Sequence, residues 1–431
     1  MFSLLKDRNF FIFWVGETIS VIGDHISLLA FPWLVLQMTG SPALTGLVLA
    51  AQGIPRALLM LSAGAMVDRT SPRLIMMLSN LARLVLVMYM AYVIAYQEID
   101  IGTVFIVAIL FGLADAFFYP ASTSMLPSLV SKEQLQQGNA LLQTTIHLGM
   151  TLGPVIAGLV IAGEISSGSH QPLESNGLAV SSFDSDREGL AQAFFVDGLT
   201  FAASLISLFF VKARGLNSED EADAASLFDE IKRGLAWVWS VPAMRLGFIG
   251  MAILDFFFIP MIHVGLPVLA NKRFAEGAYV YGLELAAYGI GALIGSIASG
   301  FIKGPRDKNL ISTLYIVYAF SGSTLALVIF YEPYWWAMLL FFITGIFDSF
   351  VFVHFATWLQ RTSPEAMIGR VMSILMLMSV GLLPIADAIM GFAIGWHLEI
   401  TMVGCSLIMV VLCGAVALHP DARKIQPIKS A

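Results

Sequence analysis

Long apolar runs separated by short polar segments make up most of this chain. A helix needs about 20 residues to cross a bilayer, and each run is long enough to do so. Twelve such runs can be placed, at residues 10–37, 44–67, 74–96, 102–126, 140–163, 193–212, 244–270, 279–303, 310–331, 335–361, 371–395 and 399–418. The pattern predicts an all-α membrane protein with twelve transmembrane helices.

Composition and charge support this prediction and add an orientation. Of the 431 residues 58% are hydrophobic and 12% are charged, about half the charged fraction of a soluble domain. If the N-terminus lies inside, most of the Lys and Arg residues fall in segments on the cytoplasmic side. The positive-inside rule therefore predicts a multi-pass protein of the cell (inner) membrane with both termini cytoplasmic.

The two halves of the chain resemble each other. TGLVLAAQGIPRALLMLSAGA (45–65) aligns without gaps on YGLELAAYGIGALIGSIASGF (281–301), and GLADAF (112–117) matches GIFDSF (345–350). Parallel six-helix repeats are an architecture of secondary transporters. We expect one six-helix bundle at residues 1–212 and another at 244–431. The cytoplasmic linker between them, 213–243, contains an expected amphipathic helix that lies at the membrane interface.

A charged turn between the second and third runs, GAMVDRTSPRL (64–74), resembles motif A of the major facilitator superfamily. The matching residues are Gly64, Asp68, Arg69 and Arg73, whereas Ser71 and Pro72 depart from the family pattern. The resemblance implies a cytoplasmic gate in which Asp68 accepts from a helix N-terminus and the arginines bind carboxylates or lipid phosphates. The alternative is a solvated basic loop that only sets topology.

Other stretches extend the resemblance over nearly the whole chain. LGMTLGPVIAG (148–158) is similar to the motif of drug/proton antiporters. Its glycines predict a helix-packing motif, because they permit close approach of a neighbouring helix. Its matching residues are Gly149, Gly153, Pro154 and Gly158. Residues 23–35, 117–141 and 370–375 resemble the macrolide-efflux and siderophore-exporter branch. The resemblance implies the major facilitator fold, two pseudo-symmetric bundles of six helices.

Ionisable residues inside the membrane are costly and are therefore candidates for function. In the first half Asp24, Arg56, Arg83 and Asp115 fall near mid-depth. We expect each buried arginine to pair with one of these two acids, because an isolated charge there would be prohibitive. His147, on the fifth run, is a further candidate for the substrate or proton pathway.

The second half has acids without bases. Asp255, Asp348 and Asp387 lie near mid-depth and Glu284 nearer the outside, with no Lys or Arg inside these spans except at their ends. Burial of an acid without a basic partner favours its neutral form, so these residues are expected proton carriers or attractants for a cationic substrate. In the superfamily fold helices 1, 4, 7 and 10 line the cavity, and each carries a mid-depth Asp here. His25, His263 and His354 are expected to be packing residues.

These features predict a secondary active transporter that exports a hydrophobic or amphipathic compound in exchange for protons. The alternatives are export or import of an endogenous metabolite, such as a siderophore or lipid-like molecule, and a non-transporting receptor. The sequence has no metal-binding His-Glu-x-x-His, nucleophile turn or phosphate-binding loop. We expect no enzyme activity, cofactor, metal or nucleic-acid partner. The expected partners are a small-molecule substrate, protons and membrane lipids, and the expected functional form is a monomer.

Overall fold

The computed structural model describes residues 4–131, 134–163, 183–212, 227–330 and 333–418, and these contain helices but no strand. Twelve helical segments are long and apolar enough to cross a membrane, which confirms the helix count and the all-α class. Those of the first half are α1 (Arg8–Thr39), α2 (Pro42–Arg69), α3 (Pro72–Tyr96), α4 (Ile101–Leu129), α5 (Leu135–Ile161) and α6 (Phe183–Phe210).

The second half begins with an interrupted helix. α8 (Pro242–Phe257) continues through the π-helical turn Met261–Gly265 into α9 (Leu266–Arg273). The sequence predicted one uninterrupted helix there, at 244–270. The remaining helices are α10 (Gly277–Phe301), α11 (Asp307–Phe330), α12 (Tyr334–Thr362), α13 (Glu365–Trp396) and α14 (Leu398–Leu418).

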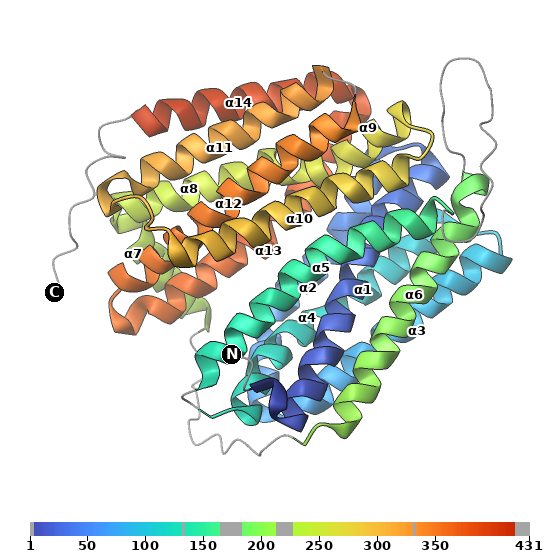
Figure 1. Cartoon of the computed structure of the whole chain (residues 1–431), viewed down its shortest axis with the longest axis horizontal. Helices are drawn as coiled ribbons and strands as arrows, with labels where there is room; N and C mark the ends of the chain where they lie inside the picture. Colours follow the sequence, from blue (N-terminus) through green and yellow to red (C-terminus); the bar gives the residue numbers. More distant parts are fainter. Residues whose placement is uncertain (1–3, 132–133, 164–182, 213–226, 331–332, 419–431) are drawn as a thin grey trace. The chain divides into compact units, whose positions relative to one another are not determined.

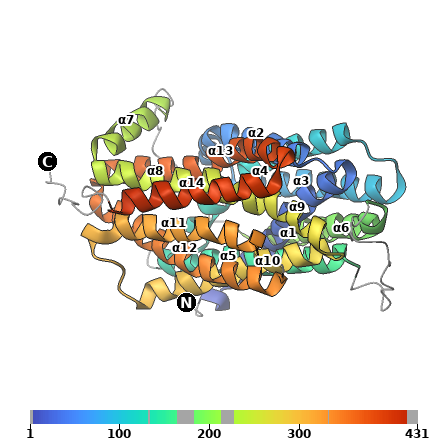
Figure 2. The same cartoon turned by 90° about the horizontal axis from the view of Figure 1, so that it is seen from above.

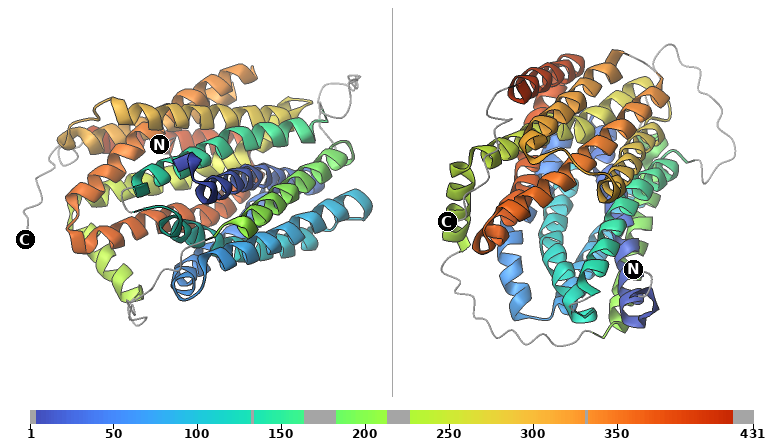
Figure 3. Two further views of the ribbon diagram at one scale, coloured as in Figure 1. Left: turned by 60° about the horizontal axis from the view of Figure 1, so that its bottom comes forward. Right: turned by 60° about the vertical axis from the view of Figure 1, so that its left-hand side comes forward.

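The chain divides into two compact units. The first comprises Met1–Asp220 and Leu266–Ala286, and the second comprises Glu221–Gly265 and Ala287–Ala431. In the first unit α1 packs along α6 and α5, and α3 packs along α6 (Figures 1 and 3). In the second unit α11 packs along α14, as Figure 2 shows. The bundle boundary expected near the linker 213–243 stays a prediction.

Polar side chains at helix ends determine where several helices begin. The carboxylate of Asp7 accepts from the Phe10 amide at 2.9 Å, and Ser41 and Asp100 cap α2 and α4 in the same way. Two hydrogen bonds from Thr103 hold the pKa of the exposed Asp100 carboxyl below its ordinary value. The bond from the Thr103 hydroxyl has the larger effect and the bond from its amide the smaller one. These caps satisfy amide groups that have no partner within the helix.

The amphipathic helix expected in the linker is present as α7 (Leu227–Ser240). It packs on α8 and α13 of the second unit, where Val238 is buried. Trp239, on the other side of the same turn, is 52% exposed. One face of α7 is therefore bound to the protein and another is free, as an interfacial helix requires.

The internal repeat is visible as a repeated backbone contact. A Cβ atom added to Gly112 of α4 would overlap the carbonyl oxygen of Gln52 of α2. One added to Gly345 of α12 would overlap the carbonyl oxygen of Tyr288 of α10. Gln52 and Tyr288 are equivalent in the alignment of the two halves, as are Gly112 and Gly345. Each repeat therefore depends on a glycine for the same close helix–helix approach.

Replacing either glycine by alanine should force these helices apart. We expect Gly112→Ala and Gly345→Ala each to lower the free energy of unfolding by about 1–3 kcal/mol, the usual cost of overpacking. Thermal unfolding of the purified protein in detergent measures the effect. Gly414→Ala is the control, because a Cβ there meets nothing within 4 Å. Equal unfolding temperatures for all three variants would contradict the contact.

Candidate functional site

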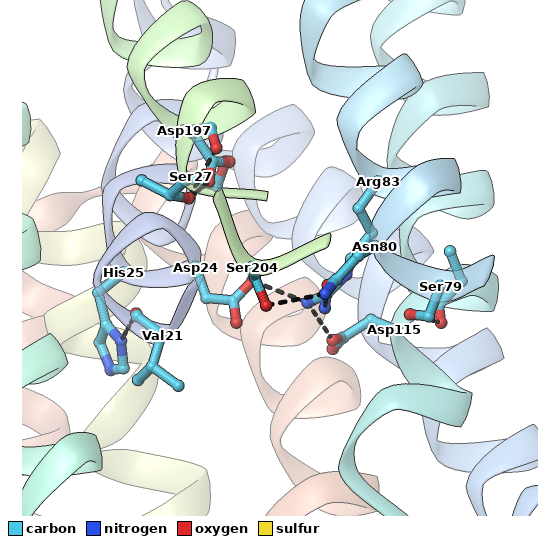
Figure 4. A network of polar contacts seen from close by, with 12 residues as sticks. Val21, Asp24, His25, Ser27, Ser79, Asn80, Arg83, Asp115, Asp197 and Ser204 are labelled. Carbon is cyan, nitrogen blue, oxygen red and sulfur yellow. Dashed lines mark hydrogen bonds and ion pairs between the residues drawn. The ribbon is translucent and has the colours of Figure 1, made fainter. Parts of the chain in front are cut away.

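A completely buried arginine forms the centre of the polar network in the first unit. The Nη1 atom of Arg83, on α3, donates to Oδ1 of Asp24 on α1 at 2.9 Å and to Oδ1 of Asp115 on α4 at 3.1 Å (Figure 4). Its Nη2 atom donates to Oδ1 of Asn80 at 2.6 Å. One guanidinium thus joins α1, α3 and α4.

A second arginine balances the charge. Arg56, on α2, donates to Oδ2 of Asp115 at 3.2 Å, so that Asp115 lies between two guanidinium groups. Two bases therefore face two acids, which confirms the pairing expected from the sequence. The side chains of Arg56 and Asp115 are 35% and 19% exposed, whereas that of Arg83 is 0% exposed.

Aromatic rings cover the Arg83 guanidinium. Its Cζ atom lies 4.0 Å from the centroid of the Phe118 ring and 4.4 Å from that of Phe201. The ring faces attract the cation and keep water away from it. Ser204, also on α6, accepts a 2.9 Å hydrogen bond from Asn80 and so connects the network to a fourth helix.

Sequence reasoning missed a buried acid on α6. Asp197, on α6, is completely buried and accepts hydrogen bonds from the hydroxyls of Ser27 and, at 3.3 Å, Thr200. The sequence placed the start of this helix at 193, which left Asp197 near its end. The helix begins ten residues earlier, at Phe183, so that Asp197 lies halfway along it. The acid inside an apolar run was the signal that could have identified it.

Glu17 is a further buried acid, on the same polar stripe of α1 as Asp24. Its Oε1 atom accepts a 2.6 Å hydrogen bond from Ser122 of α4. No hydrogen-bond partner of its Oε2 atom lies within the described part of the chain. Hydroxyls or guanidinium groups of neighbouring helices therefore bind four acids of the first unit: Glu17, Asp24, Asp115 and Asp197.

In the second unit Asp348 occupies the position that Asp115 has in the first. Ser321 of α11 donates to its Oδ1 atom at 2.7 Å, and Tyr288 of α10 donates to its Oδ2 atom at 3.5 Å. The partners of Asp115 come from the corresponding helices, α2 and α3. The two repeats thus place an acid at one position, but surround it with guanidinium groups in one unit and hydroxyls in the other.

The other acids of the second half differ in their surroundings. Asp255, near the end of α8, has a buried Oδ2 atom without a hydrogen-bond partner among the described residues. Asp387 has no Lys or Arg partner among the described residues, but its Oδ2 atom lies 3.3 Å from Nδ1 of His263. His263 belongs to the π-helical turn, and the sequence suggested only packing for it.

Glu284 and His147 join neither of these clusters. Glu284 is buried and belongs to the first unit by its contacts. The Nδ1 atom of His147 is also buried, and within the described chain no hydrogen bond reaches it. Their place in a substrate or proton pathway stays a prediction.

Only part of the gate motif can be described. α2 extends to Arg69, but the surroundings of Gly64 and the side chains of Asp68 and Arg69 lie outside what the structure describes. Arg73 donates to the carbonyl oxygens of Leu208 and Phe209, both at 2.7 Å, and its binding of carboxylates or lipid phosphates stays a prediction. It thereby satisfies carbonyl groups in the last turn of α6.

The helix-packing motif on α5 faces two neighbours within the first unit. Gly149 and Gly153 lie against α1, next to His25. Gly158 lies against the backbone of Tyr279 at the start of α10, and the carbonyl oxygen of Pro154 lies against Gly282. The motif therefore allows α5 to approach both α1 and α10 closely.

The charge network predicts a specific pattern of rescue. Arg83→Gln leaves Asp24 without a basic partner, whereas Asp115 keeps Arg56. We expect this variant to lose about 3–5 kcal/mol of stability, because removing one member strands a buried charge. Adding Asp24→Asn should restore more of the unfolding temperature than adding Asp115→Asn. Equal rescue by both, or by neither, would contradict the proposed pairing.

Known proteins similar to this chain are membrane transporters. The multidrug efflux pump Tap of Mycolicibacterium fortuitum is 26% identical over 415 residues, which cover 94% of this chain and 93% of that protein. Macrolide efflux protein A of Streptococcus pyogenes is 26% identical over 152 residues, 35% of this chain and 38% of that protein. These names indicate a transporter and not an enzyme.

Solved structures share the fold. A D-xylose–proton symporter superposes with a TM-score of 0.71 at 14% identity, covering 96% of this chain and 99% of that one. The nucleoside transporter NupG has a TM-score of 0.68 at 11% identity, covering 95% and 98%. At such identities the similarity concerns the fold alone. The model of the Major Facilitator Superfamily matches residues 13–386, and the chain belongs to this superfamily.

Proposed function

We propose that the protein is a proton-coupled exporter of a hydrophobic or amphipathic compound and works by alternating access. The observation that carries the proposal is the difference between the two units at one repeated position. Asp115 is held by two guanidinium groups, whereas the hydrogen bonds to Asp348 from the described residues come from two hydroxyls. The names of the relatives support efflux as the direction of transport.

In this proposal the charge network of the first unit has a structural role. Its two acids and two arginines neutralise one another, so protonation of Asp24 or Asp115 would remove one of the two charged partners of the buried Arg83 guanidinium. We assign these residues to structural support of α1, α3 and α4 around the transport path.

The second unit supplies the proton carrier. The Ser321 and Tyr288 hydroxyls donate to Asp348, and a hydroxyl oxygen can equally accept from a protonated carboxyl. Gain or loss of a proton at Asp348 therefore strands no neighbouring charge. A carboxylate used in turn by proton and substrate would make the two compete, which an antiporter requires. Asp255 is the second candidate, because its Oδ2 atom is buried and unpaired among the described residues.

A siderophore or lipid-like metabolite is the second candidate substrate. On the distribution of its basic residues we place the protein in the inner membrane with both termini cytoplasmic, and we propose that it works as a monomer.

Asp348→Asn tests the proton carrier. In liposomes with an imposed pH gradient it should abolish accumulation of a transported dye or drug while keeping downhill exchange, because the amide cannot release a proton. Asp255→Asn should show a milder defect. Glu399→Gln, which changes an exposed acid, is the control. Normal proton-driven accumulation by Asp348→Asn would place the carrier elsewhere.

Asp68→Asn tests the gate implied by motif A. The variant should insert and fold normally but transport more slowly, because the amide weakens a charge-assisted contact of the closed state. Ser71→Ala, at an exposed position of the same turn, controls for changes in the loop. Unchanged initial rates of efflux in Asp68→Asn would make Asp68 an ordinary loop residue.

A further inference from the structure

The second unit contains a pocket that the proposed transport mechanism does not use. It has a volume of about 420 Å³ and lies where α10 ends, α11 begins and α12 ends. Its lining includes Lys303, Gly304, Asp307, His354 and Arg361. Arg361 lies about 20 Å along α12 from Asp348, from the 1.5 Å rise per residue of a helix. The pocket is therefore near the end of the membrane span.

The charges of this pocket are not neutralised by ion pairs. Lys303 and Arg361 are exposed, and among the described residues neither forms an ion pair, even with Asp307 in the same lining. The ring of His354 covers Gly304 as a wall of the pocket, and its Nδ1 atom is engaged by the Phe350 carbonyl oxygen at 2.8 Å. Two basic side chains against one acid leave a positive pocket open to an anion.

Apolar side chains lie beside the basic ones. Phe301 is 87% exposed and Ile302 is 58% exposed, directly before Lys303 in the chain. Trp358, in contrast, is buried in the lining. Exposed Phe and Ile next to an exposed Lys fit the boundary between acyl chains and headgroups. The distribution of basic residues places this loop on the cytoplasmic side, where the leaflet carries anionic lipids.

We propose that this pocket binds the phosphate group of an anionic phospholipid of the cytoplasmic leaflet. Lys303 and Arg361 bind the phosphate oxygens by charge-assisted hydrogen bonds, and Phe301 and Ile302 contact the acyl chains. Basic pockets between helix ends on this side of a membrane are suited to such headgroups. A soluble phosphate ester offers the same phosphate but lacks acyl chains, and the apolar rim favours the lipid.

Retention of lipid by the purified full-length chain tests the proposal. The protein is exchanged into mixed micelles with phosphatidylglycerol, and bound lipid is counted by native mass spectrometry. Lys303→Gln/Arg361→Gln should lower retention about fivefold or more, since each basic group contributes to attraction by an anionic surface. Arg306→Gln/Lys308→Gln is the matched control, because it makes the same charge change close to Lys303 in the chain but outside the pocket lining. Equal retention by both double variants would overturn the proposal.

Two further arms identify the pocket and the source of the phosphate. Thr357→Trp fills the pocket without changing its charge and should also lose phosphatidylglycerol. Wild-type retention by this variant would mean that the charges act outside the pocket, contrary to the proposal. Glycerol 3-phosphate should not displace the lipid at equal concentration, and displacement would overturn the assignment to a lipid. Unfolding temperatures of all variants should match the wild type, because the changed side chains are exposed.

Discussion

The buried guanidinium of Arg83 imposes the strictest physical constraint on this structure. A charge in a medium of low dielectric constant persists only if it is paired and hydrogen-bonded. Arg83 meets this requirement with Asp24, Asp115 and Asn80 from three helices, and Phe118 and Phe201 cover it. Its partners fix the rotation of α1, α3 and α4 about their own axes. The packing of α2 and α6 then follows through Arg56 and Ser204.

The repeats share their backbone packing but differ in the chemistry built on it. Gly112 and Gly345 allow the same close approach of equivalent helices, and three residues beyond each glycine lies an Asp. In the first unit the neighbouring helices surround that Asp with arginines, and in the second with Ser321 and Tyr288. Duplication thus supplied two acids in matching positions. The side chains around them allow one to serve structure and the other to exchange a proton.

Sequence reasoning predicted the features that depend on composition and on pairing rules. The helix count follows from twelve apolar runs. The partners of Arg56 and Arg83 follow from the cost of an unpaired buried charge. The break between α8 and α9 was not predicted, because hydropathy alone does not distinguish an irregular apolar turn from a helix. The start of α6 was not predicted, because its first turns, FDSDREGLAQ (183–192), are too polar to be recognised by hydropathy. Asp197 was missed for the same reason, since its depth depends on where α6 begins.

Contacts that depend on exact geometry also could not be predicted. Arg73 binds carbonyl groups at the end of α6, where a family motif suggested anionic partners. The pairing of His263 with Asp387 depends on a π-helical turn, which rotates that side chain relative to a regular helix. The basic pocket near Lys303 is formed by three helix ends that no sequence pattern brings together. Such features arise from how the helices end and turn, not from which residues they contain.

The central claim is that Asp348 exchanges a proton when substrate binds, whereas the acids around Arg83 do not. The most direct test measures protons released from the purified protein in weakly buffered detergent solution as a transported compound is added. The account predicts release by the wild type and by Asp24→Asn, and none by Asp348→Asn at saturating substrate. Undiminished release by Asp348→Asn, or its loss only in Asp24→Asn, would contradict the account.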